Sequence, residues 1–124
     1  MDIINIPVMM RGGGFDKQGD RISDDCVISF NGTVCLVHDF KKNLAEAIGT
    51  AHLKVVGDTV LADLYIIDNG IPYSLLTPAV GGKILKSISD IKIGRKIITE
   101  MVIDVVSLNI SENADPRIKR IGEL

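Results

Sequence analysis

The stretch LVHDF, residues 36–40, places His38 at the end of an apolar run and follows it directly with Asp39. His38 is one of only two histidines in the chain. Because side chains alternate along a strand, His38 shares a face with Val34 and Leu36, and we expect this face to point inward. An imidazole on a buried face is either a core residue with satisfied ring nitrogens or a general base.

A histidine base is commonly oriented by a carboxylate, and the segment IITEMVIDVVSL contains two of them. As a strand, this segment places Glu100 and Asp104 on one largely apolar face, roughly 13 Å apart at about 3.3 Å per residue. That distance is too large for both to serve one partner. A buried unpaired charge is costly, so each carboxylate is either paired, for example with a histidine, or solvated.

The segment TPAVGGKI, residues 77–84, combines a proline with two glycines. Pro78 fixes its own backbone, whereas Gly81 and Gly82 can take conformations that are closed to other residues. The segment is therefore either a turn into a strand or a loop whose amide N–H groups could stabilise an oxyanion. The second interpretation requires a nucleophile beside the loop.

Strands must position these residues, because the apolar residues come in short runs rich in Val and Ile and broken by Gly, Asn and Asp. The pattern predicts strands over residues 2–10, 48–56, 59–67, 80–88 and 96–109, and a hairpin of residues 26–30 and 33–38. Two short helices are predicted, at KKNLAEAI and near IPYSLL, where Pro78 ends the second. The tail after Asn113 is predicted to be a loosely attached extension.

The predicted hairpin turns at Asn31-Gly32 and carries both cysteines, Cys26 and Cys35. Its register makes the thiols diagonal neighbours, with Cα atoms roughly 7 to 8 Å apart. That distance is too large for an unstrained disulfide, so we expect free, buried thiols. No ligands stand at zinc-like spacing, and neither a metal nor another cofactor is expected.

The chain has 124 residues, 46% of them hydrophobic, which is enough for one core and one domain. Charged residues make up 24% and leave a net charge of -2, so no basic face for a phosphate backbone is indicated. No positively charged leader precedes the first apolar stretch, and no apolar run reaches the roughly 20 residues that cross a bilayer. We expect a soluble intracellular protein with no nucleic-acid or membrane partner.

Five segments occur in the order seen in tailed-phage prohead (capsid maturation) proteases. They are FDKQGDRIS, VCLVHDF, AIGTAHLKVVGDTVLADL, PAVGGKI and IDVVSLNISENADPRI. The resemblance spans residues 14–118, and its motifs are more specific in their order and spacing than singly. It implies a fold similar to that of the herpesvirus assembly proteases, a β-barrel flanked by a few helices. We therefore expect one domain, residues 1–124, that is mainly β with one or two short helices and forms a small closed or partly open barrel.

Members of this family are serine peptidases that cut scaffold and capsid proteins inside the immature phage head. They use a serine and a histidine supported by a third polar group. The resemblance makes His38 the general base and places the nucleophile at position 79, where this chain has Ala79. For the third group we expect Asp104 first and Glu100 second. His52 shares its face with polar residues and is expected to be exposed.

Alanine has no hydroxyl and cannot form an acyl-enzyme. Ala79 is an engineered replacement, a natural loss in a descendant that kept the barrel, or a sign that another residue supplies the hydroxyl. The candidates for that residue are Ser74, Thr77 and Ser87.

The resulting expectation is a phage or prophage virion assembly or structural protein without serine peptidase activity. The alternative is a prohead maturation serine protease. In either case the expected partners are phage structural or scaffold proteins, within a homo- or hetero-oligomer. The expected location is the host cytoplasm during assembly, or the virion.

Overall fold

The computed structural model describes residues 2–39, 47–68, 70–90 and 92–124. Its elements are β1 (Asp2–Met10), β2 (Asp20–His38), β3 (Ala47–Val56), β4 (Thr59–Ile66), the 3₁₀ turn η2 (Tyr73–Leu75), β5 (Thr77–Asp90), β6 (Arg95–Asn109) and the 3₁₀ turn η3 (Ile121–Glu123). The prediction of a mainly β chain is confirmed, and so are the five strands predicted outside the hairpin. The strand predicted from residue 80 begins earlier, at Thr77.

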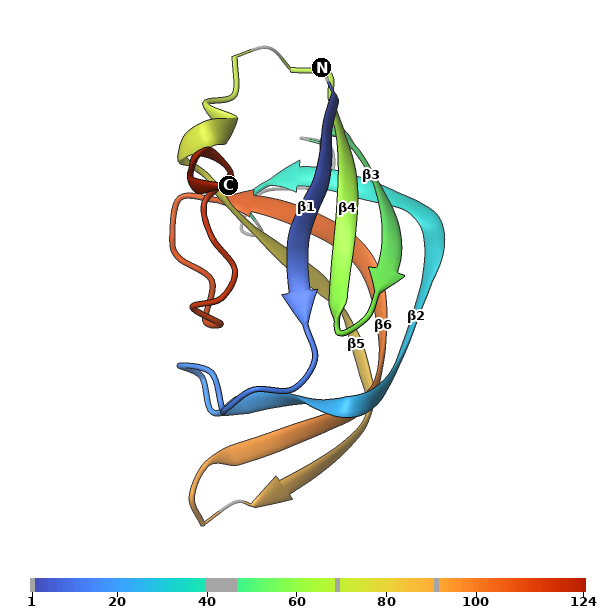
Figure 1. Cartoon of the computed structure of the whole chain (residues 1–124), viewed down its shortest axis with the longest axis vertical. Helices are drawn as coiled ribbons and strands as arrows, with labels where there is room; N and C mark the ends of the chain where they lie inside the picture. The colour runs from blue at the N-terminus through green and yellow to red at the C-terminus, as the bar shows by residue number, and fades with distance from the viewer. Residues whose placement is uncertain (1, 40–46, 69, 91) are drawn as a thin grey trace.

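Within the described residues, all strands belong to one strongly curled sheet with the order β1-β4-β3-β2-β6-β5 (Figure 1). Neighbouring strands are antiparallel except β2 and β6, which run parallel. The edge strands β1 and β5 approach each other but form no ladder. The sheet is therefore open along a seam between β1 and β5, so the closed form of the predicted closed or partly open barrel is wrong.

The predicted hairpin at Asn31-Gly32 is also wrong, because β2 continues through these residues as one strand of 19 residues. Its parallel ladder with β6 resumes after the interruption, from the pair Phe30–Ile103 to the pair Cys35–Val105. Between these pairs β2 advances five residues while β6 advances two. Asn31 and Gly32 thus form an irregularity within the strand and not a turn. Pairing with β6 before and after these residues keeps β2 running in one direction.

The two cysteines consequently lie along one strand and do not face each other. Both are free, as predicted. Cys26 is buried and Cys35 only partly so. Burial raises the pKa of the Cys26 thiol, outweighing the nearby charge of Arg11.

The predicted helices are replaced by other structure wherever the chain is described. Residues 41–46 of KKNLAEAI lie outside the described residues, while Ala47 and Ile48 begin β3. The segment near IPYSLL forms only η2. Among the described residues no helix has the length and apolar character to cross a membrane.

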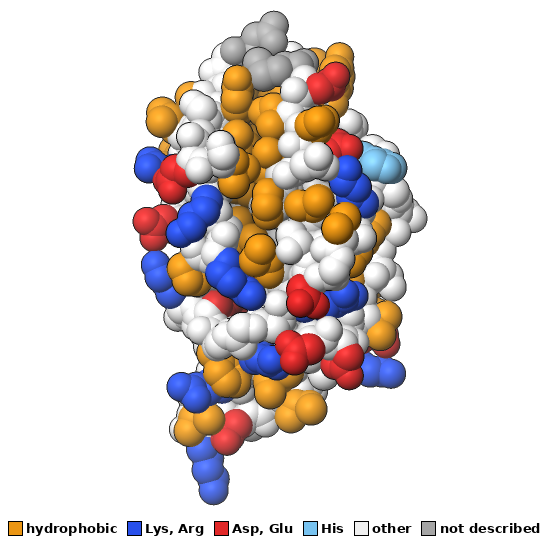
Figure 2. All heavy atoms as spheres, viewed as in Figure 1, with side chains coloured by type: hydrophobic (Ala, Val, Ile, Leu, Met, Phe, Trp, Pro, Cys, Tyr) orange, Lys and Arg blue, Asp and Glu red, His pale blue; other side chains and the backbone are white. Residues whose placement is uncertain are grey.

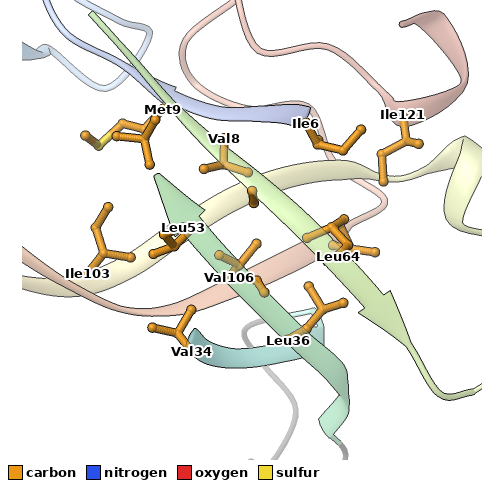
Figure 3. Close-up of a cluster of buried hydrophobic side chains, with 14 of the residues drawn as sticks. Ile6, Val8, Met9, Val34, Leu36, Leu53, Leu64, Ile103, Val106 and Ile121 are labelled. Carbon is orange, nitrogen blue, oxygen red and sulfur yellow. The ribbon is translucent and has the colours of Figure 1, made fainter. Parts of the chain in front are cut away.

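The core lies inside the curl of the sheet and receives alternate side chains from β1, β2, β3, β4 and β6 (Figure 3). Val80 of β5 is partly buried and packs against it. Leu36, Val60, Val106 and Leu108 are fully buried, and Leu64 is 1% exposed. Period-2 alternation explains this arrangement, since each strand turns one row of aliphatic side chains inward. The same apolar pattern predicted that Val34 and Leu36 face inward, and both are buried.

The C-terminal tail is packed against the body, and the prediction of a loose extension is wrong. Ile118 and Ile121 are buried, at 4% and 8% exposure. The backbone N–H of Ile121 donates to the carbonyl of Leu76, and the Asn113 side chain donates to the carbonyl of Pro78. Ile121 anchors the tail by joining the core near η2, and Ile118 adds buried apolar area beside the seam.

We expect Leu64→Ala to lower the free energy of unfolding by about 2–5 kcal/mol, because it removes buried methyl groups and leaves a cavity. Urea denaturation followed by circular dichroism measures the change. Ile110→Ala is the matched control, since Ile110 is 78% exposed and its truncation should change stability by no more than about 0.5 kcal/mol. Equal effects of the two variants would contradict the assigned core.

Candidate functional site

The candidate site begins with His38, at the last position of β2. His38 pairs with Leu108 of β6, and Leu108 pairs with Pro78 of β5. The three residues form one row across the sheet, with β6 between the imidazole and the start of β5. Two strand spacings amount to about 10 Å. His38 and Pro78 thus lie at the same end of the same sheet but not in adjacent strands.

Ala79 belongs to the neighbouring row, in which it pairs with Ser107, and Ser107 pairs with Val37. Residues paired across a sheet share a face, and consecutive residues point to opposite faces. The row of His38 therefore faces the core side, on which Leu108 and Pro78 are buried. A side chain at position 79 points to the other side of the sheet, so the ladder does not bring it toward the imidazole.

The imidazole of His38 is half-buried, and its Nε2 atom is enclosed without a hydrogen-bond partner in the described structure. A buried unsatisfied ring nitrogen is costly and uncommon in a folded protein. The following residue, Asp39, has a φ of 66° and donates its backbone N–H to the carbonyl of Leu108 at 3.0 Å. His38 is thus held at the end of β2 with one buried ring nitrogen that no described residue satisfies.

Neither predicted carboxylate lies beside His38. Asp104 is skipped in the pairing of β6 with β2 and in its pairing with β5. In both ladders the paired residues of β6 are Ile103 and then Val105. As a bulged residue Asp104 is exposed, so its predicted place on an apolar face is wrong. Glu100 is half-buried and pairs with Lys86 at 3.7 Å. Along β6, Asp104 and Glu100 are four and eight residues from the partner of His38, or about 13 and 26 Å.

The alternative hydroxyls are placed in three different settings. Thr77 is 2% exposed and shares the sheet face of position 79. Ser74 is exposed in η2. Ser87 lies in the exposed half of β5, nine residues beyond Pro78 and so about 30 Å along the strand.

Ser107 is a hydroxyl that the sequence analysis overlooked, although it pairs directly with Ala79. It is fully buried, and its Oγ atom donates to Oδ1 of Asn109 at 2.6 Å. A satisfied hydroxyl without solvent access serves packing rather than attack on a substrate. The alternation of side chains along VVSLN, residues 105–109, could have shown that Ser107 lies on the other face of the strand from Val106 and Leu108.

Gly81 and Gly82 form part of β5, where they pair with Val105 and Ile103 across a register shift. A Cβ atom at Gly82 would collide with the backbone carbonyl of Val102. Close approach of two strands at a bulge therefore explains this glycine. Of the two alternatives for this segment, a turn into a strand or an oxyanion loop, the loop is replaced by paired strand backbone.

The seam between β1 and β5 contains a cavity of about 480 Å³. Its lining combines apolar residues with a charged rim; representative members are Met9, Ile98, Met101, Asp16, Lys83 and Arg117. The tail borders it, held by Arg117, which donates to the carbonyls of Met10, Arg11 and Gly12. Arg117 also forms an ion pair with Asp115 at 2.8 Å. Sequence reasoning missed this arginine because the carbonyls that it binds lie more than a hundred residues earlier in the chain.

His52 is exposed, as predicted, and its Nδ1 atom lies 3.3 Å from the hydroxyl of Thr33. In the described part of the chain, no group of three or more His, Cys, Asp or Glu side chains could hold a metal ion. The chain matches none of the family models, curated proteins or solved structures with which it was compared.

Asp115 should contribute stability that depends on pH. Burial alone would raise the pKa of Asp115, but the hydrogen bonds and charge of Arg117 outweigh it and lower that pKa. A lowered folded-state pKa gives a stabilisation that is present above the unfolded value of about 3.9 and is lost as the pH falls through the folded value.

We therefore expect Asp115→Asn to be less stable than the wild type at pH 7, with the difference shrinking below about pH 4. Urea denaturation at a series of pH values measures it. Asp104→Asn, at an exposed position, is the control and should change stability little at pH 7. A difference that grows in acid would contradict the role given to the Asp115–Arg117 pair.

Proposed function

We propose that the chain is a virion assembly or structural protein of a phage or prophage, built on a fold like that of the prohead proteases and without serine peptidase activity. Support for the phage setting comes from the ordered motifs of residues 14–118. Support for the loss of activity comes from Ala79, at the position of the family serine. On this proposal the chain binds partners and does not cut them.

The observation that carries the proposal is the arrangement of rows across β2, β6 and β5. His38 is on the row of Pro78, and Ala79 is on the adjacent row facing the other side of the sheet. A general base must come within about 2.6–3.2 Å of the hydroxyl it deprotonates. A serine at position 79 would project away from the imidazole, so restoring the hydroxyl would not restore this pair.

The surface of the molecule is consistent with a binding role. β5 is an edge strand, and its residues from Lys83 to Asp90 are all exposed. Exposed edge strands are common sites for contact with another chain. The seam cavity beside the first part of β5 adds a concave surface with both apolar and charged residues.

One observation favours the alternative of a prohead maturation serine protease. The Nε2 atom of His38 is enclosed without a partner in the described structure, and a nucleophilic hydroxyl would satisfy it. This alternative requires either a serine at position 79 with a changed register of β5, or a different hydroxyl. The labelling experiment below discriminates between the two functions.

We expect no labelling when the wild type and Ala79→Ser are incubated with a biotinylated phosphonate that reacts with activated serines. The physical reason is the opposite orientation of position 79 and His38. Blotting for biotin and intact-mass measurement detect the adduct. Ala79→Ser/His38→Ala is the matched control, and heat-denatured protein reports non-specific reaction.

Labelling of Ala79→Ser that disappears in the double variant would support the protease and overturn our proposal. Labelling of the wild type that depends on His38 would do the same through another hydroxyl.

A further inference from the structure

The hairpin of β5 and β6 extends beyond the curled part of the sheet (Figure 1). We call residues 83–96 the arm; residue 91 is outside the described residues. Four large apolar side chains of the arm are between 44% and 66% exposed, namely Ile84, Leu85, Ile88 and Ile93. Ile84 pairs with Met101 on the core side of the sheet, whereas Ile88 pairs with Ile97 on the other side. Exposed apolar side chains therefore lie on both faces of the projecting hairpin, and such exposure marks a protein contact.

The arm is also strongly basic. It contains five Lys and Arg residues and one Asp, for a net charge of +4, whereas the whole chain carries -2, so the remaining residues carry -6. Figure 2 shows basic and hydrophobic side chains together on the lower extension of the molecule. Lys83 and Lys92 form no ion pair with any described residue. The charge of the arm is thus only partly neutralised within its own chain.

β1 begins and β4 ends at the opposite end of the molecule (Figure 1). A second exposed apolar surface lies at this end. We call Asp2, Ile4, Tyr65, Ile67 and Asp68 the end patch. Asp2 pairs with Tyr65 across the two strands, and by alternation Ile4 and Ile67 share their outward face. The side chain of Ile4 is 66% exposed, that of Tyr65 50% and that of Ile67 65%.

The charge of the end patch is opposite to that of the arm. Neither Asp2 nor Asp68 forms an ion pair with a described residue, although the Asp68 side chain accepts the N–H of Gly70. The nearby Asp63 is already paired with Lys54 at 3.7 Å. Two carboxylates that no described residue pairs with therefore flank the apolar side chains of this patch.

We propose that the arm of one molecule binds the end patch of a second copy of this chain. Each surface offers exposed aliphatic side chains, and the uncompensated charges on the two are opposite, so burying one against the other removes apolar area from water and pairs the charges. A contact between two arms is disfavoured, because it would bring two basic surfaces together. The contact is therefore head-to-tail and not symmetric.

A head-to-tail contact leaves one arm and one end patch free in every dimer. Repetition of the contact then produces a ring if the rotation closes and a filament if it does not. This inference deepens the proposed assembly role, on which it rests for its setting in a phage particle. It names a second copy of the chain as the first partner in that assembly.

The test uses two variants that remove apolar side chains without changing charge. Leu85→Gln/Ile88→Gln alters the arm, and Ile4→Gln/Ile67→Gln alters the end patch. The wild type should associate with rising concentration in sedimentation velocity at low salt, and each variant should associate at least tenfold more weakly. Mixed together, the two variants should form a 1:1 complex that does not grow, because only one intact arm and one intact end patch remain.

Ile110→Gln is the matched control, since Ile110 is exposed outside both surfaces and its variant should associate like the wild type. Raising the salt concentration should weaken wild-type association, because the paired charges are near the surface. Lys83→Glu/Lys92→Glu provides a second arm variant and should also lose association, whereas the charge-matched Lys17→Glu/Lys119→Glu should not.

Three results would overturn the head-to-tail contact. The first is a wild type that stays monomeric at low salt and high concentration. The second is a mixture of the two glutamine variants that stays monomeric while the wild type associates, and the third is a control that loses association as much as the variants do. Phosphonate labelling tests for peptidase activity independently of self-association. A labelled protein that still self-associates overturns only the absence of peptidase activity, and an unlabelled monomer overturns only this contact.

Discussion

The parallel pairing of β2 with β6 is the interaction on which the rest of the structure depends. It runs from Asp20–Lys96 to His38–Leu108 and continues across the interruption at Asn31-Gly32. β3 joins the second part of β2, and β5 joins the other side of β6, so each half of the sheet is attached through this one ladder. Parallel strands cannot be formed by a tight turn, and their pairing therefore requires residues that are far apart in the chain. This pairing overrides the turn preference of Asn31-Gly32, because a chain reversal there would break the pairing with β6 either before or after these two residues.

The same ladder determines what chemistry the sheet can perform. Because β6 lies between β2 and β5, the pairing partner of His38 is Leu108 and not a residue of β5. Adjacent rows of side chains also face opposite sides of the sheet. A proton transfer between His38 and position 79 would need a change of register by one residue, and such a change would turn the buried side chains of β5 outward. The core thus opposes the rearrangement that a serine peptidase would require.

The open seam and the arm are two consequences of a sheet that does not close. Along the seam, Arg117 and Asn113 attach the tail to the backbone of distant segments, and Ile118 and Ile121 bury apolar area. Beyond the seam, the arm has no such cover and keeps its aliphatic and basic side chains exposed. Apolar and charged groups are thereby distributed unevenly, with a basic apolar hairpin at one end and an acidic apolar patch at the other.

The sequence by itself determined where most strands run and that Val34 and Leu36 face the core, because alternation of Val, Ile and Leu is a local property that any pleated strand expresses. It also determined that position 79 has no hydroxyl and that His52 is exposed. It could not reveal that Asn31-Gly32 lies within one strand, that Asp104 is bulged out of both ladders, or that the tail is anchored. Only the tertiary structure decided these points, since strand order and register depend on pairings between distant residues, whose free energy outweighs local turn preference. For the same reason the spacing of His38, Ala79 and Asp104 along the chain could not show that the sheet separates them.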